Sequence, residues 1–73
     1  MFGVRLDDIS PNYPADMAGI KKGDIVIEFD GVPIRTPGEL SARVKRAVPY
    51  NTIKVVVMRE SEKIEIPVKM GKL

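Results

Sequence analysis

The sequence contains no cysteine, histidine or tryptophan. Without cysteine it can form neither a disulfide nor a thiolate metal site. Without histidine it lacks the commonest general base, the usual partner of a serine nucleophile and the commonest metal ligand. A catalytic site would need Ser10, Ser41 or Ser61 beside a lysine, and each serine lies in a predicted cap, helix surface or turn. We therefore expect a non-catalytic chain without metal or cofactor.

Long apolar runs, aromatic residues and excess charge are also scarce. The longest apolar run is Val55 to Met58, far shorter than a membrane span. Two phenylalanines and two tyrosines are too few for a base-stacking platform. The net charge is +2, and the cluster Arg43, Lys45 and Arg46 suits the last turn of a helix, where the dipole favours cations. We expect neither nucleic-acid binding nor membrane insertion.

The 73 residues leave room for one domain with one modest core. Apolar content of 44% and charged content of 30% are ordinary for a folded domain. The chain has no internal repeat, low-complexity tract or linker. We therefore treat residues 1–73 as a single domain.

Apolar periodicity and turn residues predict two helices and four to five strands. Pro14 and Gly19 suit the first position and the left-handed end of a short helix between them. Thr36, Pro37 and Glu39 form a capping signature for a longer helix that runs to about Val48, before Pro49. The predicted strands cover residues 3–9, 25–29, 32–34, 52–59 and 63–70.

The order of these elements predicts an α+β fold. Its sheet is small, curved and mostly antiparallel, a sandwich or partly open barrel with the longer helix over the open side. Leu40, Val44 and Val48 recur every four residues and should face the core. Asp30-Gly31 is a strong hairpin signal. The apolar strand 52–59 should be buried on both faces.

Asp24 and the four methionines have structural interpretations that we favour over functional ones. Asp24 follows a tight turn and has no nearby base, nucleophile or ligand set, so we expect it to accept hydrogen bonds from nearby N–H groups. The methionines should fill gaps in the core; they are Met1, Met17, Met58 and Met70.

Three stretches resemble PDZ domains and together cover about residues 2–70. Residues 14–26 are similar to the family's Pro-Ala-x-x-Ala-Gly-Leu/Ile-x-x-Gly-Asp-x-Ile/Val. Residues 30–34 resemble its Asn/Asp-Gly-x-Pro-Val/Ile hairpin, and residues 36–40 lie where its groove helix begins. The last strand, 62–68, resembles the ending of circularly permuted domains of bacterial proteases. Such domains occur in HtrA-like serine proteases, site-2 metalloproteases, carboxy-terminal processing proteases and secretion-system components.

This resemblance implies a peptide-binding module excised from a larger extracytoplasmic, periplasmic protease, which recruits substrate or regulates the enzyme. Its expected partners are C-terminal or extended peptides and other domains of the parent chain. PDZ domains bind the peptide as an added strand between a sheet edge and the long helix. The implied peptide-binding residues are Phe2, Gly3, Val4, Leu6, Glu39, Leu40, Arg43, Val44 and Ala47. The alternative is an assembly module without a free peptide ligand.

The amino-terminal stretch decides between these two functions. Met1-Phe2-Gly3-Val4 resembles the family's carboxylate-binding loop, whose amides hold a peptide terminus. The segment from Arg5 to Tyr13 is too short for the two strands that normally follow that loop. A routine strand start at Gly3 is equally consistent with the sequence, and it would leave the groove without one wall.

Overall fold

The computed structural model describes residues 3–9, 11–46 and 51–70. Five strands and two helices follow one another along the chain, which confirms the α+β expectation. The strands are β1 (Val4–Arg5), β2 (Ile25–Phe29), β3 (Val32–Pro33), β4 (Thr52–Arg59) and β5 (Glu62–Lys69). The helices are α1 (Pro14–Ala18) and α2 (Pro37–Arg46). Sequence features outside the described residues are Met1, Phe2, Ser10, Ala47, Val48 and Pro49.

All strand pairs are antiparallel, and the sheet is not closed into a barrel. β4 pairs with β5 along its whole length and with β2 on its other side. The remaining edge of β2 is shared, because β1 pairs with Ile25 and Val26 whereas β3 pairs with Glu28 and Phe29. A register irregularity between Val26 and Glu28 separates the two stretches, and such a bulge bends a strand.

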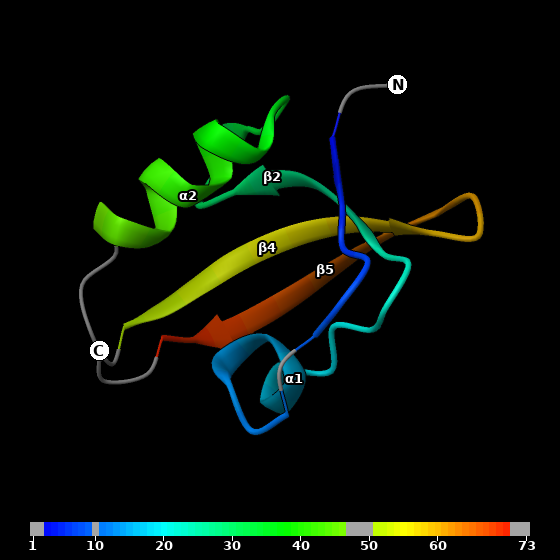
Figure 1. The fold of residues 1–73 in the computed structure, drawn as a ribbon, viewed down its shortest axis with the longest axis horizontal. Coiled ribbons are helices and arrows are strands. Elements are labelled where there is room, and N and C mark those ends of the chain that lie inside the picture. Colours follow the sequence, from blue (N-terminus) through cyan, green and yellow to red (C-terminus); the bar gives the residue numbers. More distant parts are fainter. Residues whose placement is uncertain (1–2, 10, 47–50, 71–73) are drawn as a thin grey trace.

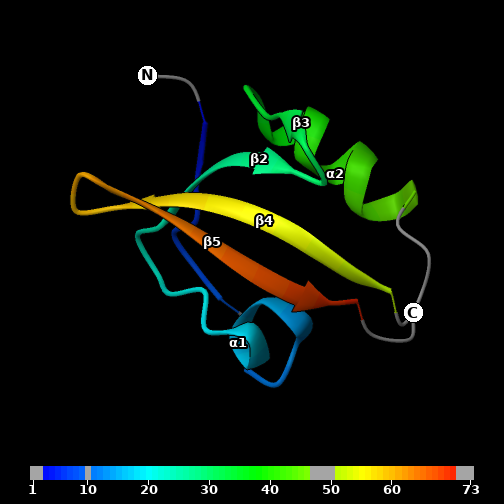
Figure 2. The same cartoon turned by 180° about the vertical axis from the view of Figure 1, so that it is seen from behind.

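The two helices lie at opposite borders of the sheet (Figure 1). α1 packs beside β5, and α2 lies near the end of β2. Seen from behind, α2 also lies beside β3 (Figure 2). Both helices contribute half-buried side chains to one core, but neither contains a buried residue.

The core draws on every strand except β3. Val55 and Val57 are 3% and 0% exposed and belong to the main cluster. Val56 points to the opposite face by strand alternation, and it is only 1% exposed. The prediction that this strand is buried on both faces is therefore confirmed. The other cluster members are Val4, Ile20, Val26, Phe29, Ile34, Ile53, Ile66 and Val68.

The turn residues behave as the sequence predicts. Gly19 ends α1 with φ of 97°, and Asp30 and Gly31 both have positive φ in the β2–β3 hairpin. The turn between β4 and β5 also has positive φ, at Glu60 (48°) and Ser61 (72°), without a glycine.

Three details differ from the sequence prediction. The first strand is two residues long instead of seven, because its partner turns away at Gly23, where φ is 93°. The Thr36 hydroxyl accepts a bond from the Glu39 amide at 3.2 Å, but the Glu39 carboxylate does not return one to Thr36. Met17 does not fill a core gap, since it is 77% exposed. Met58 and Met70 are half-buried, as expected.

The phase of α2 predicts different costs for two neighbouring substitutions. Val44 is half-buried against the core and Lys45 is exposed. We expect Val44→Asp to lower the free energy of unfolding by about 2 kcal/mol, since a partly buried carboxylate without a partner is penalised. Lys45→Asp should change it by less than about 0.5 kcal/mol. Thermal melts of both variants measure this, and equal melting temperatures would contradict the helix phase.

Candidate functional site

The described residues that were predicted to bind peptide fall into two groups along one edge of β2. Gly3, Val4 and Leu6 lie in or beside β1, next to the first half of β2. The helix group lies near the opposite end of β2, where Arg43 lines a pocket with Phe29. Phe29 lies three positions beyond Val26 in β2, which is about 10 Å of extended chain. The helix group comprises Glu39, Leu40, Arg43 and Val44.

The hydrogen bonds of Leu6 identify the free edge of β1. Its N–H donates to the Asp24 carbonyl at 2.8 Å, and its carbonyl accepts from Gly23 at 2.7 Å. Both groups therefore face β2. Because main-chain groups alternate in an antiparallel pair, the N–H and carbonyl of Arg5 point away from β2. Beyond Leu6 the chain bends at Asp7, so this free edge is short.

Gly3 allows a close approach between the start of the chain and β2. A Cβ at this position would lie 2.5 Å from Ile25 Cγ2 and 2.9 Å from the Val26 carbonyl oxygen. The backbone itself therefore requires glycine here. This contact supports a strand start seated on β2 as the role of Gly3.

The apolar members of the helix group face the core and its polar members face outward. Leu40 and Val44 pack against the main cluster and are half-buried. Glu39 is exposed, while Arg43 is half-buried at the border between the two faces. Arg43 is therefore the polar side chain of this group best placed to contact both an apolar surface and a ligand.

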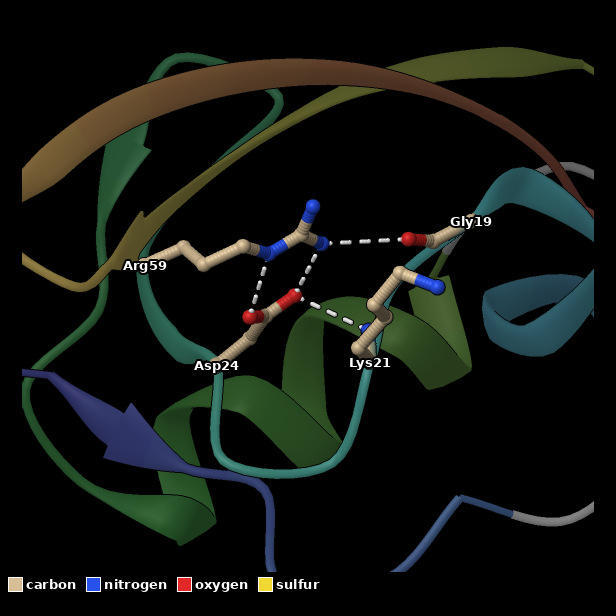
Figure 3. A network of polar contacts seen from close by, with 4 residues as sticks. All are labelled: Gly19, Lys21, Asp24 and Arg59. Carbon is tan, nitrogen blue, oxygen red and sulfur yellow. Dashed lines mark hydrogen bonds and ion pairs between the residues drawn. The ribbon is translucent and has the colours of Figure 1, made fainter.

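A buried ion pair fixes the loop that precedes β2 (Figure 3). Asp24 is 2% exposed. Its carboxylate accepts bonds from Arg59 Nε at 2.9 Å and Nη2 at 2.7 Å. The Lys21 N–H donates to the same carboxylate at 2.9 Å, and Arg59 Nη2 also donates to the Gly19 carbonyl at 3.1 Å.

These contacts confirm that Asp24 accepts a backbone hydrogen bond, and they add a partner that sequence reasoning missed. The register of β2 with β4 is the feature that identifies Arg59 as the partner. Ile25 pairs with Met58, so the next antiparallel position places Asp24 opposite Arg59. A buried carboxylate that follows a turn needs such a cation.

The same contacts perturb both ionisable groups. The pKa of Asp24 is lowered, and the largest cause is its hydrogen bonding to Arg59. Burial of the carboxylate raises the pKa and so opposes this effect, while the hydrogen bond from the Lys21 amide lowers it further. The hydrogen bond to Asp24 raises the pKa of Arg59 above its usual range. Both groups therefore stay charged at neutral pH.

Two other kinds of site were sought among the described residues, a metal-ligand cluster and a membrane-spanning helix. No group of three potential acidic, cysteine or histidine ligands gathers among them. No helix within the described ranges is long and apolar enough to cross a membrane.

An open antiparallel sheet with a free edge strand and a nearby helix is the architecture of domains that bind extended peptides. The chain belongs to the PDZ domain family, since residues 3–70 match that family. PDZ domains are non-catalytic peptide-binding modules.

Relatives and solved structures agree on the type of protein to which this domain is similar. The chain is 34% identical over 68 residues to a probable periplasmic serine endoprotease, DegP-like, from Rickettsia conorii. It is 33% identical over 66 residues to the serine protease HTRA1 of Xenopus laevis. These matches cover 93% and 90% of this chain but only 13% and 14% of the relatives. The HtrA-like resemblance is thereby confirmed, at the level of this one domain.

Two solved structures share the fold closely. The serine endoprotease from Yersinia pestis matches 99% of this chain and 28% of its own, with a TM-score of 0.90 and 27% identity. The HtrA3 PDZ domain bound to the phage-derived ligand FGRWV matches 93% of this chain and 62% of its own, with a TM-score of 0.82 and 25% identity.

The Asp24–Arg59 pair predicts a specific acid sensitivity. Because the pKa of Asp24 is lowered on folding, its contribution is fully present above the unfolded value, about 3.9, and is lost as the pH falls below it. We expect Asp24→Asn to lower the free energy of unfolding by about 2 kcal/mol at pH 7, since it replaces the charge-assisted hydrogen bonds to the partly exposed Arg59 by weaker neutral ones. The cost should shrink as the pH falls below that unfolded value, because protonation of Asp24 in the wild type removes the same charge.

Urea unfolding at several pH values measures this cost. Asp16→Asn is the matched control, because Asp16 is exposed and its carboxylate accepts a backbone hydrogen bond from the Asn12 amide, without an ion-pair partner among the described residues. A cost for Asp24→Asn that does not vary with pH would contradict the charge-based explanation.

Two glycine substitutions test the close approach at Gly3. We expect Gly3→Ala to lower stability by about 1–3 kcal/mol, since the new methyl group overlaps the Val26 carbonyl. Gly38 lies in α2, where the nearest atom to a new Cβ is 3.9 Å away. Gly38→Ala should therefore raise stability by up to about 1 kcal/mol. Thermal melts compare the two, and a neutral Gly3→Ala would contradict the contact.

Proposed function

We propose that this domain captures extended peptides for a larger HtrA-type serine protease in an extracytoplasmic compartment, either to recruit substrate or to regulate the enzyme. The similarity to DegP-like and HTRA1 proteases supports the parent type. The names of the DegP-like relatives, which include the word periplasmic, support the compartment. The chain spans about an eighth of these relatives, so residues 1–73 are proposed to be one domain of such a protein.

The observation that carries the proposal is the free edge of β1 on the same side of the sheet as α2. Arg5 directs one main-chain donor and one acceptor away from β2. β1 and β3 share an edge of β2, and α2 follows β3 in the chain. A peptide strand added at Arg5 would therefore run on the helix side, toward Leu40 and Val44. The ligand-bound HtrA3 PDZ domain, which shares this fold, supports peptide binding as the activity.

The shortness of the edge limits the affinity. Only Arg5 offers a complete outward pair within β1, because Leu6 is bonded to the β2 side and the chain bends at Asp7. Few main-chain bonds and a small buried area are typical of transient complexes. We therefore expect dissociation constants that are micromolar or weaker.

The same observation favours one alternative. Gly3 packs closely on β2, and the outer edge of the short strand β1 has room for another strand. If a segment or domain of a larger parent occupies that edge, the module serves assembly and captures no free peptide.

An NMR titration with extended peptides that end in an apolar residue tests the peptide-binding function. We expect amide shifts at Gly3–Leu6 and along α2, because the peptide contacts both elements. Arg5→Pro should abolish binding, since proline lacks the donor N–H but is tolerated at a strand edge. Arg5→Ala, which keeps that N–H, should bind within about threefold of the wild type.

Two outcomes separate the alternatives. Shifts that survive in Arg5→Pro, with the fold intact in its melt, would contradict strand addition. No shift with any peptide at millimolar concentration would contradict peptide capture and favour the assembly function.

A further inference from the structure

A shallow pocket lies between α2 and the tip of the β2–β3 hairpin, and the proposed peptide-binding role does not yet use it. Its volume is about 80 Å³, enough for a small group such as a carboxylate but not for a large aromatic side chain. α2 lies beside β3 and the end of β2 at this place (Figure 2). The lining residues are Phe29, Asp30, Val32, Arg43, Arg46 and Ile53.

The floor and walls of the pocket differ in polarity. Phe29 and Ile53 are buried core residues, 5% and 9% exposed, and Val32 is half-buried. Arg43 and Arg46 stand three residues apart on α2, the spacing that places two side chains on neighbouring positions of one helix face. Two cations therefore flank an apolar floor.

Neither pocket arginine has an ion-pair partner among the described residues. Arg59, by contrast, is paired with Asp24 at 2.7 Å. Arg43 is half-buried, so its guanidinium is partly withdrawn from water. An anion placed beside a partly desolvated cation gains more than it would in open solvent.

We propose that this pocket is a carboxylate-binding subsite, in which Arg43 and Arg46 bind a carboxylate of the captured peptide. The inference rests on the proposed peptide-binding function and adds the chemistry that the domain selects. The planar guanidinium fork matches a carboxylate through two parallel hydrogen bonds. The carboxylate is that of an Asp or Glu side chain of the peptide.

Two features of the pocket oppose an anion and make the proposal easy to test. The C-terminal end of a helix favours cations, which by itself accounts for basic residues in the last turn. Asp30 brings one negative charge to the rim. Since Asp30 has φ of 53° in an Asp-Gly turn, asparagine fits the same backbone. Asp30→Asn therefore removes the charge while the hairpin is kept.

The experiment measures how well the domain distinguishes peptides that differ in charge alone. A set of seven-residue apolar peptides carries one Glu at successive positions, and each peptide has a Gln counterpart. Each is made with a free and with an amidated C-terminus. We expect the peptide with Glu at one position to bind about fivefold more tightly than its Gln counterpart, with a free or an amidated terminus, as for a partly exposed ion pair.

Three variants assign this preference to the pocket. Arg43→Gln/Arg46→Gln should remove the discrimination, so that both peptides of a pair bind equally. Lys45→Gln has half that charge change on the exposed side of the same helix and should keep the discrimination. Asp30→Asn should increase it about twofold, a gain that a damaged fold cannot mimic.

Each outcome supports or overturns the proposal. A preference for Glu over Gln at one position supports the subsite, whereas a preference for the free terminus alone would overturn it. Equal binding of charged and neutral peptides by the wild type would overturn the subsite and leave peptide capture intact. If Lys45→Gln also binds the Glu and Gln peptides equally, the preference for Glu arises from the overall charge of the domain, and the subsite would be overturned as well.

A second measurement separates the subsite from peptide capture. If no peptide binds, the peptide-binding function fails, and sodium propionate is titrated against sodium chloride at equal ionic strength. Shifts of the Arg43 and Arg46 Nε–H resonances with propionate alone would support the pocket by itself. Equal shifts with both salts would overturn it.

Discussion

The ion pair between Asp24 and Arg59 sets the arrangement of the loop and helix that precede β2. Arg59 ends β4 and Asp24 precedes β2, so the pair extends the contact between these two strands by one position. Through its bond to the Gly19 carbonyl it also holds the end of α1. A helix of five residues is too short to be stable alone, and α1 has no buried residue. Its position therefore depends on this ion pair and on its contact with β5.

A buried pair adds little stability relative to apolar residues of the same volume, but the loss of one partner is costly. The interaction therefore specifies one arrangement more than it stabilises the domain.

α2 depends on weaker contacts. It is ten residues long, contains no buried residue and meets the core through the half-buried Leu40 and Val44. Most of the buried valine and isoleucine side chains belong instead to β2, β4 and β5. The rigid part of the domain is therefore the sheet, whereas α2 is the element whose apolar face has contact area to spare. Elements with few buried contacts are those that change most readily on binding.

The sequence allowed accurate prediction where one residue type has one physical role. Gly19 and Asp30-Gly31 take the positive φ values that their turns require, and Thr36 caps α2.

The long-range features were harder to predict. Arg59 had no local pattern that linked it to Asp24, and only the register of β2 with β4 connects them. The first strand is short because the partner chain turns away at Gly23, which its own alternating residues cannot reveal. Met17 is exposed because α1 is only five residues long and turns that side chain to solvent. The predicted site residues lie in two groups for a similar reason, since their separation is set by the length of β2 and not by either segment.

The separation of these two groups is compatible with a single extended ligand. β1 lies beside Ile25 and Val26, and the pocket arginines lie near Phe29, so the two groups are about 10 Å apart along the strand direction. Four or five residues of extended peptide span that length. In such a ligand the main chain of one residue would meet Arg5, and an acidic side chain a few residues away would reach the level of Arg43. Main-chain hydrogen bonds at β1 do not depend on the sequence of the peptide, so they would position the peptide without distinguishing one peptide from another. Specificity would then depend on the pocket beside α2, where the half-buried Arg43 lies next to the apolar side chains of Phe29 and Ile53. In the proposed function, the short edge strand would bind peptides weakly and without regard to sequence, and the pocket formed by Arg43 and Arg46 would determine which peptide stays bound.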